Sequence, residues 1–218
     1  MFEILKGGIV AVLETWSTPQ HRDPEFLVPM AQLVEQGGAS AILVDSVPGL
    51  AAIRHAIAIP IIAADRNRDA GDRVIFTPSI ESASVLVNTG ARIVLVSATS
   101  GHRPAGDDLV SIVEVIHAGR ALAFGLLDTA ADLAGAFEAG FDAIGTWQPR
   151  DDVEPDLALQ RWLVRHSAVP VFGGGTLWSP NDARDSLEAG AAFVMVGEAI
   201  TNPAAIAARF VSAAQRRT

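Results

Sequence analysis

Four carboxylates stand in the sequence at points where short apolar segments end. They are Glu14, Asp45, Asp65 and Asp128. If those segments are parallel strands of an α/β fold, the four groups share the end of the fold at which catalytic residues gather. Carboxylates held close together raise the pKa of one member, which creates a general acid/base pair. The alternative for each is a structural role, as a cap of the following helix or as an ion-pair partner of Arg66, Arg68 or Arg103.

Arg66 follows Asp65 directly and adds a cation to this set. A guanidinium stays protonated in proteins, so it cannot act as a general base, but it can clamp a carboxylate, an enolate or a phosphate. We therefore expect the four carboxylates to move protons and Arg66 to stabilise negative charge. This combination suits an isomerisation, an epimerisation or another proton transfer, and such reactions need no metal or organic cofactor.

A second group of residues is suited to an anion. The stretch 169–202 contains two apolar runs, and each run stops at glycine shortly before a helix begins. Glycine lets backbone N–H groups approach a ligand closely, and the helix start adds partial positive charge. The phosphate-binding candidates are Gly174, Gly175, Thr176, Gly197 and Asn202. Glu198 would oppose an anion there, and the alternative is a pair of ordinary turns between strands and helices.

Further side chains near the strand ends are candidates for contact with a substrate. They are Trp16, Ser97, His102, Arg103, Trp147 and Trp178. Three tryptophans at one rim indicate an aromatic or apolar ligand, a protein interface over the mouth, or packing among the loops. His102 is also a minor acid/base candidate.

The pattern of apolar segments predicts a single-domain (β/α)8 TIM barrel over residues 1–218, because eight apolar strands alternate with helical segments. The predicted strands are Ile9–Leu13, Ala41–Val44, Ile59–Ala63, Ile93–Val96, Leu122–Leu126, Ala143–Thr146, Val169–Phe172 and Phe193–Val196. The predicted helices are Glu25–Gln36, Gly49–His55, Ser79–Thr89, Gly106–His117, Thr129–Ala139, Asp156–His166, Pro180–Ala189 and Pro203–Gln215. The polar segments 66–73 and 148–155 are the longest loops and are therefore candidate lids.

Composition narrows the class of protein. The chain has 218 residues, 50% of them hydrophobic, and a formal net charge of -9, which argues against nucleic acid or an anionic membrane as a partner. The sequence shows no secretion signal and no apolar run long enough to span a membrane, so we expect a cytoplasmic protein. Cysteine is absent and the five histidines show no ligand spacing, so no metal is expected, although clustered carboxylates could admit Mg2+.

Several motifs resemble the N-acetylmannosamine-6-phosphate 2-epimerase family. They are KGGIV, EQGGASAI, IPIIAADRNRD, DRVIFTPSIESA, FDAIGT, SPNDA and VGEAITNPAAIAARFV, and they extend over nearly the full length. The resemblance implies a TIM barrel of sialic-acid catabolism that epimerises C2 of a phosphorylated amino sugar by proton transfer. It also implies a homodimer.

The resemblance also implies which residues occupy the family's functional positions. Arg66 falls where the family has its catalytic lysine, and Gly174 falls where it has its catalytic glutamate. Leu43 replaces a substrate-binding arginine, Leu126 replaces an aspartate that Asp128 follows by two positions, and Glu14 replaces a glutamine. Lys6, the only lysine, precedes the first predicted strand and therefore belongs to the opposite end of the barrel.

Three functions remain open at this point. The first is a diverged enzyme that kept the barrel but changed its substrate and its proton-transfer residues. The second is the family reaction on an N-acylmannosamine 6-phosphate, run through substitute residues. The third is a barrel that binds a ligand or acts as a scaffold without turnover.

Overall fold

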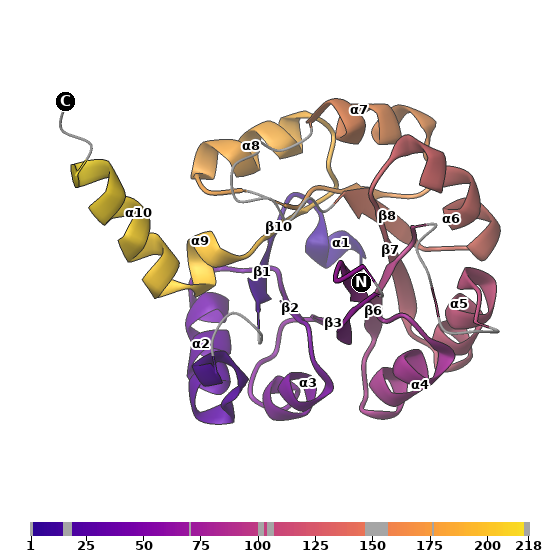
Figure 1. The fold of residues 1–218 in the computed structure, drawn as a ribbon, viewed down its shortest axis with the longest axis horizontal. Helices are drawn as coiled ribbons and strands as arrows, with labels where there is room; N and C mark the ends of the chain where they lie inside the picture. The colour runs from indigo at the N-terminus through magenta and orange to yellow at the C-terminus, as the bar shows by residue number, and fades with distance from the viewer. Residues whose placement is uncertain are drawn as a thin grey trace.

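The computed structural model describes residues 2–14, 19–69, 71–99, 103, 107–146, 157–175 and 177–215. Its central feature is a parallel sheet of eight strands in the order β10-β1-β2-β3-β6-β7-β8-β9. The two ends of this sheet meet, because Gly173 forms a parallel bridge to Val194 next to β9 and β10. The predicted barrel is therefore confirmed, and Figure 1 shows its ring of strands inside a ring of helices.

The barrel strands lie close to the predicted segments. They are β1 (Ile9–Leu13), β2 (Ala41–Val44), β3 (Ile61–Ala63), β6 (Ile93–Ser97), β7 (Leu122–Leu127), β8 (Ala143–Thr146), β9 (Val171–Phe172) and β10 (Val194–Val196). Nearly every residue in these strands is buried, because helices cover their outer face and side chains fill the interior.

The helices follow the predicted order. They are α1 (Phe2–Leu5), α2 (Pro24–Gln36), α3 (Val47–Ile53), α4 (Ile80–Asn88), α5 (Leu109–Ala118), α6 (Leu133–Ala139), α7 (Leu157–His166), α8 (Pro180–Glu188), α9 (Glu198–Thr201) and α10 (Pro203–Gln215), with 3-10 turns at Pro19–Arg22 and Ala130–Asp132. Side-chain caps fix several starts, and Ser179 and Asp182 form a reciprocal capping box at α8. None of the described helices is long and apolar enough to cross a membrane.

The short helices α1 and α9 and the strands β4 and β5 were not predicted from the sequence. The segment 66–73, expected to be a loop, belongs to an antiparallel hairpin of β4 (Arg66–Arg68) and β5 (Val74–Phe76). Asp69 closes its turn, because its carboxylate accepts hydrogen bonds from the backbone N–H groups of Gly71 and Arg73. The other candidate lid, 148–155, lies outside the described residues.

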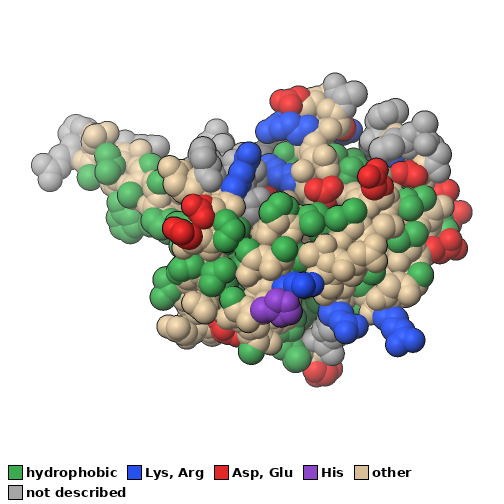
Figure 2. Space-filling model, turned by 90° about the horizontal axis from the view of Figure 1, so that it is seen from below, with side chains coloured by type: hydrophobic (Ala, Val, Ile, Leu, Met, Phe, Trp, Pro, Cys, Tyr) green, Lys and Arg blue, Asp and Glu red, His purple; other side chains and the backbone are tan. Residues whose placement is uncertain are grey.

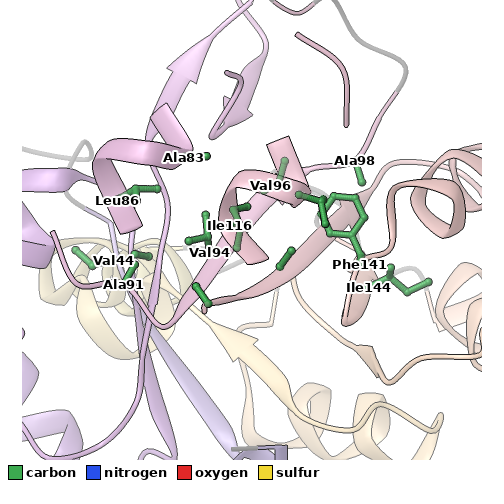
Figure 3. Close-up of a cluster of buried hydrophobic side chains, with 14 of the residues drawn as sticks. Val44, Ala83, Leu86, Ala91, Val94, Val96, Ala98, Ile116, Phe141 and Ile144 are labelled. Atoms are coloured by element: carbon green, nitrogen blue, oxygen red, sulfur yellow. The ribbon is translucent and has the colours of Figure 1, made fainter. Parts of the chain in front are cut away.

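The alternation of side chains along the strands divides the core into two layers. Leu43, Leu126 and Phe76 belong to the inner layer, within the barrel. The outer layer packs between the strands and the helices, as Figure 3 shows for Val94, Ile116 and their neighbours. Each strand therefore contributes side chains to both layers, because successive side chains along a strand point to opposite faces of the sheet.

Aromatic rings fill the amino-terminal end of the barrel. Phe124 lies 5.6, 5.9 and 5.8 Å, between ring centroids, from Phe2, Phe172 and Phe193. Phe2 comes from α1, which lies within the ring of strands in Figure 1, and Leu5 of the same helix is fully buried. The exposed Lys6 follows α1 and precedes β1, so it lies at the end of the barrel opposite the functional groups, as predicted.

A pair of glycines tests this packing. A Cβ at Gly145 would lie 2.2 Å from the Phe172 ring and 2.5 Å from its carbonyl oxygen, whereas a Cβ at Gly135 on α6 would meet nothing within 4 Å. We expect Gly145→Ala to lower the free energy of unfolding by about 1–3 kcal/mol through overpacking. Gly135→Ala should raise it by about 0.5–1 kcal/mol, because alanine favours the helix. Urea unfolding of both variants measures this, and equal effects would contradict the packing described.

Candidate active site

The mouth of the barrel holds a largely buried arginine that is paired with one carboxylate and feels the charge of a second. Arg66 begins β4 just beyond β3, and its Nη1 lies 3.7 Å from Oδ2 of Asp45, which follows β2. The Asp45 side chain is only 2% exposed and that of Arg66 only 11%. Burial lowers the pKa of the Arg66 guanidinium, while the negative charges of Asp45 and Glu14 act in the opposite direction. An arginine remains protonated under such a shift, so the site keeps a fixed positive charge.

Glu14 completes this group from the neighbouring strand. It follows β1, is half-buried, and its carboxylate packs against Gly197, where a Cβ would lie only 2.7 Å from Glu14 Oε1. Glycine at 197 therefore makes room for this carboxylate. Glu14, Asp45 and Arg66 come from the ends of three consecutive strands, and we call them the Glu14–Asp45–Arg66 cluster.

Phe76 and Thr77 fix the position of Arg66. The Arg66 guanidinium carbon lies 5.7 Å from the centroid of the Phe76 ring, and the hairpin pairs Arg66 with Phe76. Thr77 is fully buried with a φ of 48°, a left-handed conformation that costs free energy in a β-branched residue. Its Oγ1 donates to the Leu95 carbonyl at 2.7 Å and accepts from the Asp65 N–H at 3.2 Å. These bonds fasten the base of the hairpin to β6.

Asp65 binds a different set of partners from the cluster. Its carboxylate accepts from Ser82 Oγ at 2.5 Å and from Asn67 Nδ2 at 3.0 Å, and its carbonyl accepts from the Thr77 N–H at 2.7 Å. These contacts join the base of the hairpin to the start of α4. The structure thus gives Asp65 a positioning role beside Arg66.

Asp128 is an exposed residue after β7. Partial burial of its carboxylate and the nearby charge of Asp132 raise its pKa, while Arg73 on the hairpin acts in the opposite direction. A raised carboxyl pKa is a common feature of acid/base residues, but neighbouring carboxylates also produce it in structural positions. Asp128 remains a candidate on the hairpin side of the mouth.

Ser97 and Arg103 serve the local structure at the end of β6. Ser97 Oγ accepts a hydrogen bond from the Phe76 N–H at 3.0 Å, which ties β5 to the barrel. Arg103 Nη2 donates to the carbonyls of Ser97 and Thr99, and burial lowers the pKa of its guanidinium. Both side chains, predicted to contact a substrate, are therefore engaged with protein groups.

Trp178 is also engaged by the protein. The guanidinium carbon of Arg209, a residue of α10, lies 4.2 Å from the centroid of the Trp178 ring. The backbone N–H of Trp178 donates a hydrogen bond to the Asp182 carboxylate. The other predicted contact residues, Trp16, His102 and Trp147, lie outside the described residues. That Trp16 and Trp147 lie at the rim of the mouth therefore stays a prediction. The Trp178 ring packs against Arg209 of α10.

The two glycine turns differ from each other. Gly175 has a φ of 101°, which requires glycine, and Gly174 beside it is half-buried. At the second turn, the Glu14 carboxylate already lies against Gly197, and Asn202 Oδ1 accepts from the Ala205 N–H to cap α10. Thr176 lies outside the described residues. Phosphate binding at either turn stays a prediction.

Two residues inside the barrel are apolar where the resemblance implies charged side chains. Leu43 and Leu126, where the resemblance implies an arginine and an aspartate, are 1% and 3% exposed and belong to the inner layer of the core. Among the described residues, no three His, Cys, Asp or Glu side chains come together as a metal site.

Sequence reasoning missed the residues that support Arg66. Phe76, Thr77 and Ser82 all lie within the segment DRVIFTPSIESA, which was noted for its resemblance and not for any chemical group. The available signal was Thr77-Pro78 after a short apolar run, because a threonine before proline at a strand end marks a constrained turn.

Comparisons with known proteins agree with this geometry. A sequence model described as "Putative N-acetylmannosamine-6-phosphate epimerase" matches residues 27–216. The chain belongs to the N-acetylmannosamine-6-phosphate epimerase family.

A relative from Enterobacter sp. (strain 638) is 32% identical over 224 residues, covering 98% of this chain and 95% of the relative. A second, from Caldanaerobacter subterraneus subsp. tengcongensis, is 30% identical over 221 residues, covering 98% and 93%. Both are named "Putative N-acetylmannosamine-6-phosphate 2-epimerase".

A solved structure extends the family relationship to three dimensions. The N-acetylmannosamine-6-phosphate 2-epimerase from Clostridium perfringens is 28% identical, with a TM-score of 0.90 over 98% of this chain and 96% of that one. A thiamine phosphate pyrophosphorylase from Pyrococcus furiosus, 16% identical with a TM-score of 0.63, shares the barrel fold alone. This homologue is thus named as an epimerase, and it has the same fold as this chain.

Thr77 offers a test of how the mouth is supported. We expect Thr77→Val, which keeps the shape but removes both side-chain hydrogen bonds, to lower the free energy of unfolding by about 1–3 kcal/mol. Thr77→Ser retains the hydroxyl and should lower the free energy of unfolding by a smaller amount. Urea unfolding of the two variants gives the comparison, and a valine variant as stable as wild type would show that the hydroxyl does not fasten the hairpin.

Proposed function

We propose that this protein is a cofactor-independent epimerase of a phosphorylated N-acylamino sugar, with N-acetylmannosamine 6-phosphate as the first substrate to test. The observation that carries the proposal is the Glu14–Asp45–Arg66 cluster, in which one fixed cation pairs with Asp45 and interacts electrostatically with Glu14 at the mouth of the barrel. Membership of the epimerase family and the names of its relatives support the choice of substrate.

The chemistry follows from the acidity of C2 in the open-chain sugar. A carboxylate removes the C2 proton, and the electrons of the C–H bond move toward C1, so that the aldehyde becomes an enolate. The Arg66 guanidinium stabilises the negative charge that develops on O1. Return of a proton to the opposite face of C2 restores the aldehyde with inverted configuration, so the reaction consumes no other reactant.

The two carboxylates have different roles in this proposal. Glu14 is half-buried and is the group that exchanges protons with the substrate. Asp45 is 2% exposed and holds the guanidinium in place, so it acts as a positioning residue. Its replacement would leave a buried arginine without its nearest counter-charge.

A second candidate function is a related proton transfer on a different substrate. Its support is the resemblance, which implies Arg66 and Gly174 in place of the family's lysine and glutamate, together with the apolar Leu43 and Leu126 inside the barrel. The same cluster would carry the proton transfer.

Amide variants test the first proposal. Glu14→Gln should reduce formation of the C2 epimer by about 10²–10⁴-fold, because it removes the proton carrier without changing shape. Asp45→Asn should also reduce the rate, and Glu138→Gln, an exposed carboxylate on α6, should leave it unchanged. Epimer formation is followed by NMR of the sugar phosphate. Unchanged rates in both cluster variants would remove the cluster from the mechanism.

Restoring the residues that the resemblance implies separates the two candidates. If the family reaction is native to this chain, Arg66→Lys with Gly174→Glu should leave the protein no better than wild type, because Glu14 and Arg66 already form a working set. If another substrate is native, wild type should be inactive on N-acetylmannosamine 6-phosphate and the double variant should gain activity. The assay is the same, with circular dichroism to confirm folding.

A further inference from the structure

His21 differs from the other histidines that the structure describes. It is 8% exposed, whereas His55, His117 and His166 are exposed, and Figure 2 shows histidine, in purple, at the surface of the molecule. His21 lies on the 3-10 turn Pro19–Arg22, which follows β1 and precedes α2. Buried polar side chains are generally hydrogen-bonded, so the partners of this imidazole indicate what it does.

A hydrogen bond joins His21 to the backbone of Glu14. The Nδ1 atom of His21 lies 3.2 Å from the carbonyl oxygen of Glu14. A carbonyl oxygen only accepts hydrogen bonds, so Nδ1 carries a proton and is the donor. The bond therefore links the 3-10 turn to the residue that follows β1, which is the residue that transfers the proton in the proposed function.

The ring of Phe26 holds the imidazole in this orientation. The two rings stack with their centroids 4.8 Å apart and an interplanar angle of 18°. Phe26 belongs to the first turn of α2, where the Asp23 carbonyl accepts from the Phe26 N–H at 3.0 Å and the Asp23 carboxylate accepts from the Glu25 N–H at 2.9 Å. A capped helix thus fixes Phe26, Phe26 orients His21, and His21 holds the carbonyl of Glu14.

Contacts with α9 restrain Glu14 as well. Thr201 Oγ1 donates to the carbonyl oxygen of Val12 at 2.7 Å, which fastens β1 to this helix. The Glu14 carboxylate lies so close to Gly197 that a Cβ there would come within 2.7 Å of Oε1. Its negative charge also favours the protonated form of Arg66. A shift of the Glu14 backbone would therefore move the carboxylate relative to both Gly197 and Arg66.

We propose that His21 is a positioning residue for proton transfer, which fixes the backbone of Glu14 and thereby holds its carboxylate where C2 of the substrate requires it. This role rests on the proposed function, in which Glu14 is the proton carrier. An error of about 1 Å in the position of a reacting group lowers a rate by as much as about 10²-fold. His21 acts through Glu14 and not on the substrate, so its loss should lower kcat and leave KM nearly unchanged.

Two substitutions of His21 separate the hydrogen bond from the ring stack. His21→Phe keeps an aromatic ring against Phe26 and removes the donor, whereas His21→Asn places an amide N–H at the position of Nδ1. We expect His21→Phe to lower kcat for epimer formation by roughly 10–100-fold, with KM within about twofold of wild type. His21→Asn should retain most of the activity. His55→Phe, which changes an exposed histidine, is the matched control and should behave as wild type.

His21→Gln keeps the test decisive if the phenylalanine variant does not fold. Its amide nitrogen occupies the position of Nε2, one bond further from the backbone than Nδ1, so this variant should lose activity as His21→Phe does. Circular dichroism confirms which variants are folded. Full activity in a folded His21→Phe or His21→Gln variant, or an equal loss in His21→Asn, would overturn the positioning role.

The NMR signal of the Glu14 carboxyl carbon distinguishes a failure of this role from a failure of the proposed function. Protein labelled with ¹³C at the glutamate carboxyl carbons gives this signal, and its loss in Glu14→Gln assigns it. His21→Phe should shift the signal, because the carboxylate moves relative to the charge of Arg66, and His21→Asn should return it toward the wild-type position. Wild type that exchanges no C2 proton would count against the proposed function, whereas a Glu14 signal unmoved by His21→Phe would overturn the role of His21.

Discussion

The ion pair between Arg66 and Asp45 is the interaction on which the mouth of the barrel depends. Both side chains are almost fully covered, and a buried charge is tolerated only when a counter-charge lies close to it. Asp45 follows β2 and Arg66 begins β4 just beyond β3, so this pair links the barrel to the β4–β5 hairpin. Glu14, which follows β1, adds a second negative charge that also favours the protonated guanidinium.

The β4–β5 hairpin positions Arg66 at the mouth of the barrel. Its base is held by Thr77, whose hydroxyl bonds to β6 from a left-handed backbone conformation, and by the hydrogen bonds of Asp65 to Ser82 and Asn67. Strained backbone of this kind persists only where its surroundings over-determine it. Asp65, predicted from the sequence as a proton carrier, forms hydrogen bonds at the base of the hairpin that presents Arg66.

The sequence predicted the barrel well and the site in part. Strands such as Ile9–Leu13 and Ala143–Thr146 were found at their observed bounds, because burial on both faces leaves a short unbroken apolar run. The hairpin was missed because the segment RNRDAGDRV is polar, and its pairing depends on the Asp69 turn and on contacts with Ser97 and Leu95 that lie distant in sequence. Similarly, no local pattern shows that Arg209 stacks on Trp178, since the two belong to different units of the barrel.

The chain shares the barrel of the N-acetylmannosamine-6-phosphate epimerase family, and the catalytic role of the Glu14–Asp45–Arg66 cluster is our proposal. The most direct measurement is proton exchange at C2: wild-type protein is incubated in D2O with N-acetylmannosamine 6-phosphate, and the C2–H signal is followed by NMR. The account predicts that this signal is lost as deuterium enters C2 and that the epimer accumulates. Retention of the C2 proton by folded protein, beside an active family enzyme under the same conditions, would contradict it.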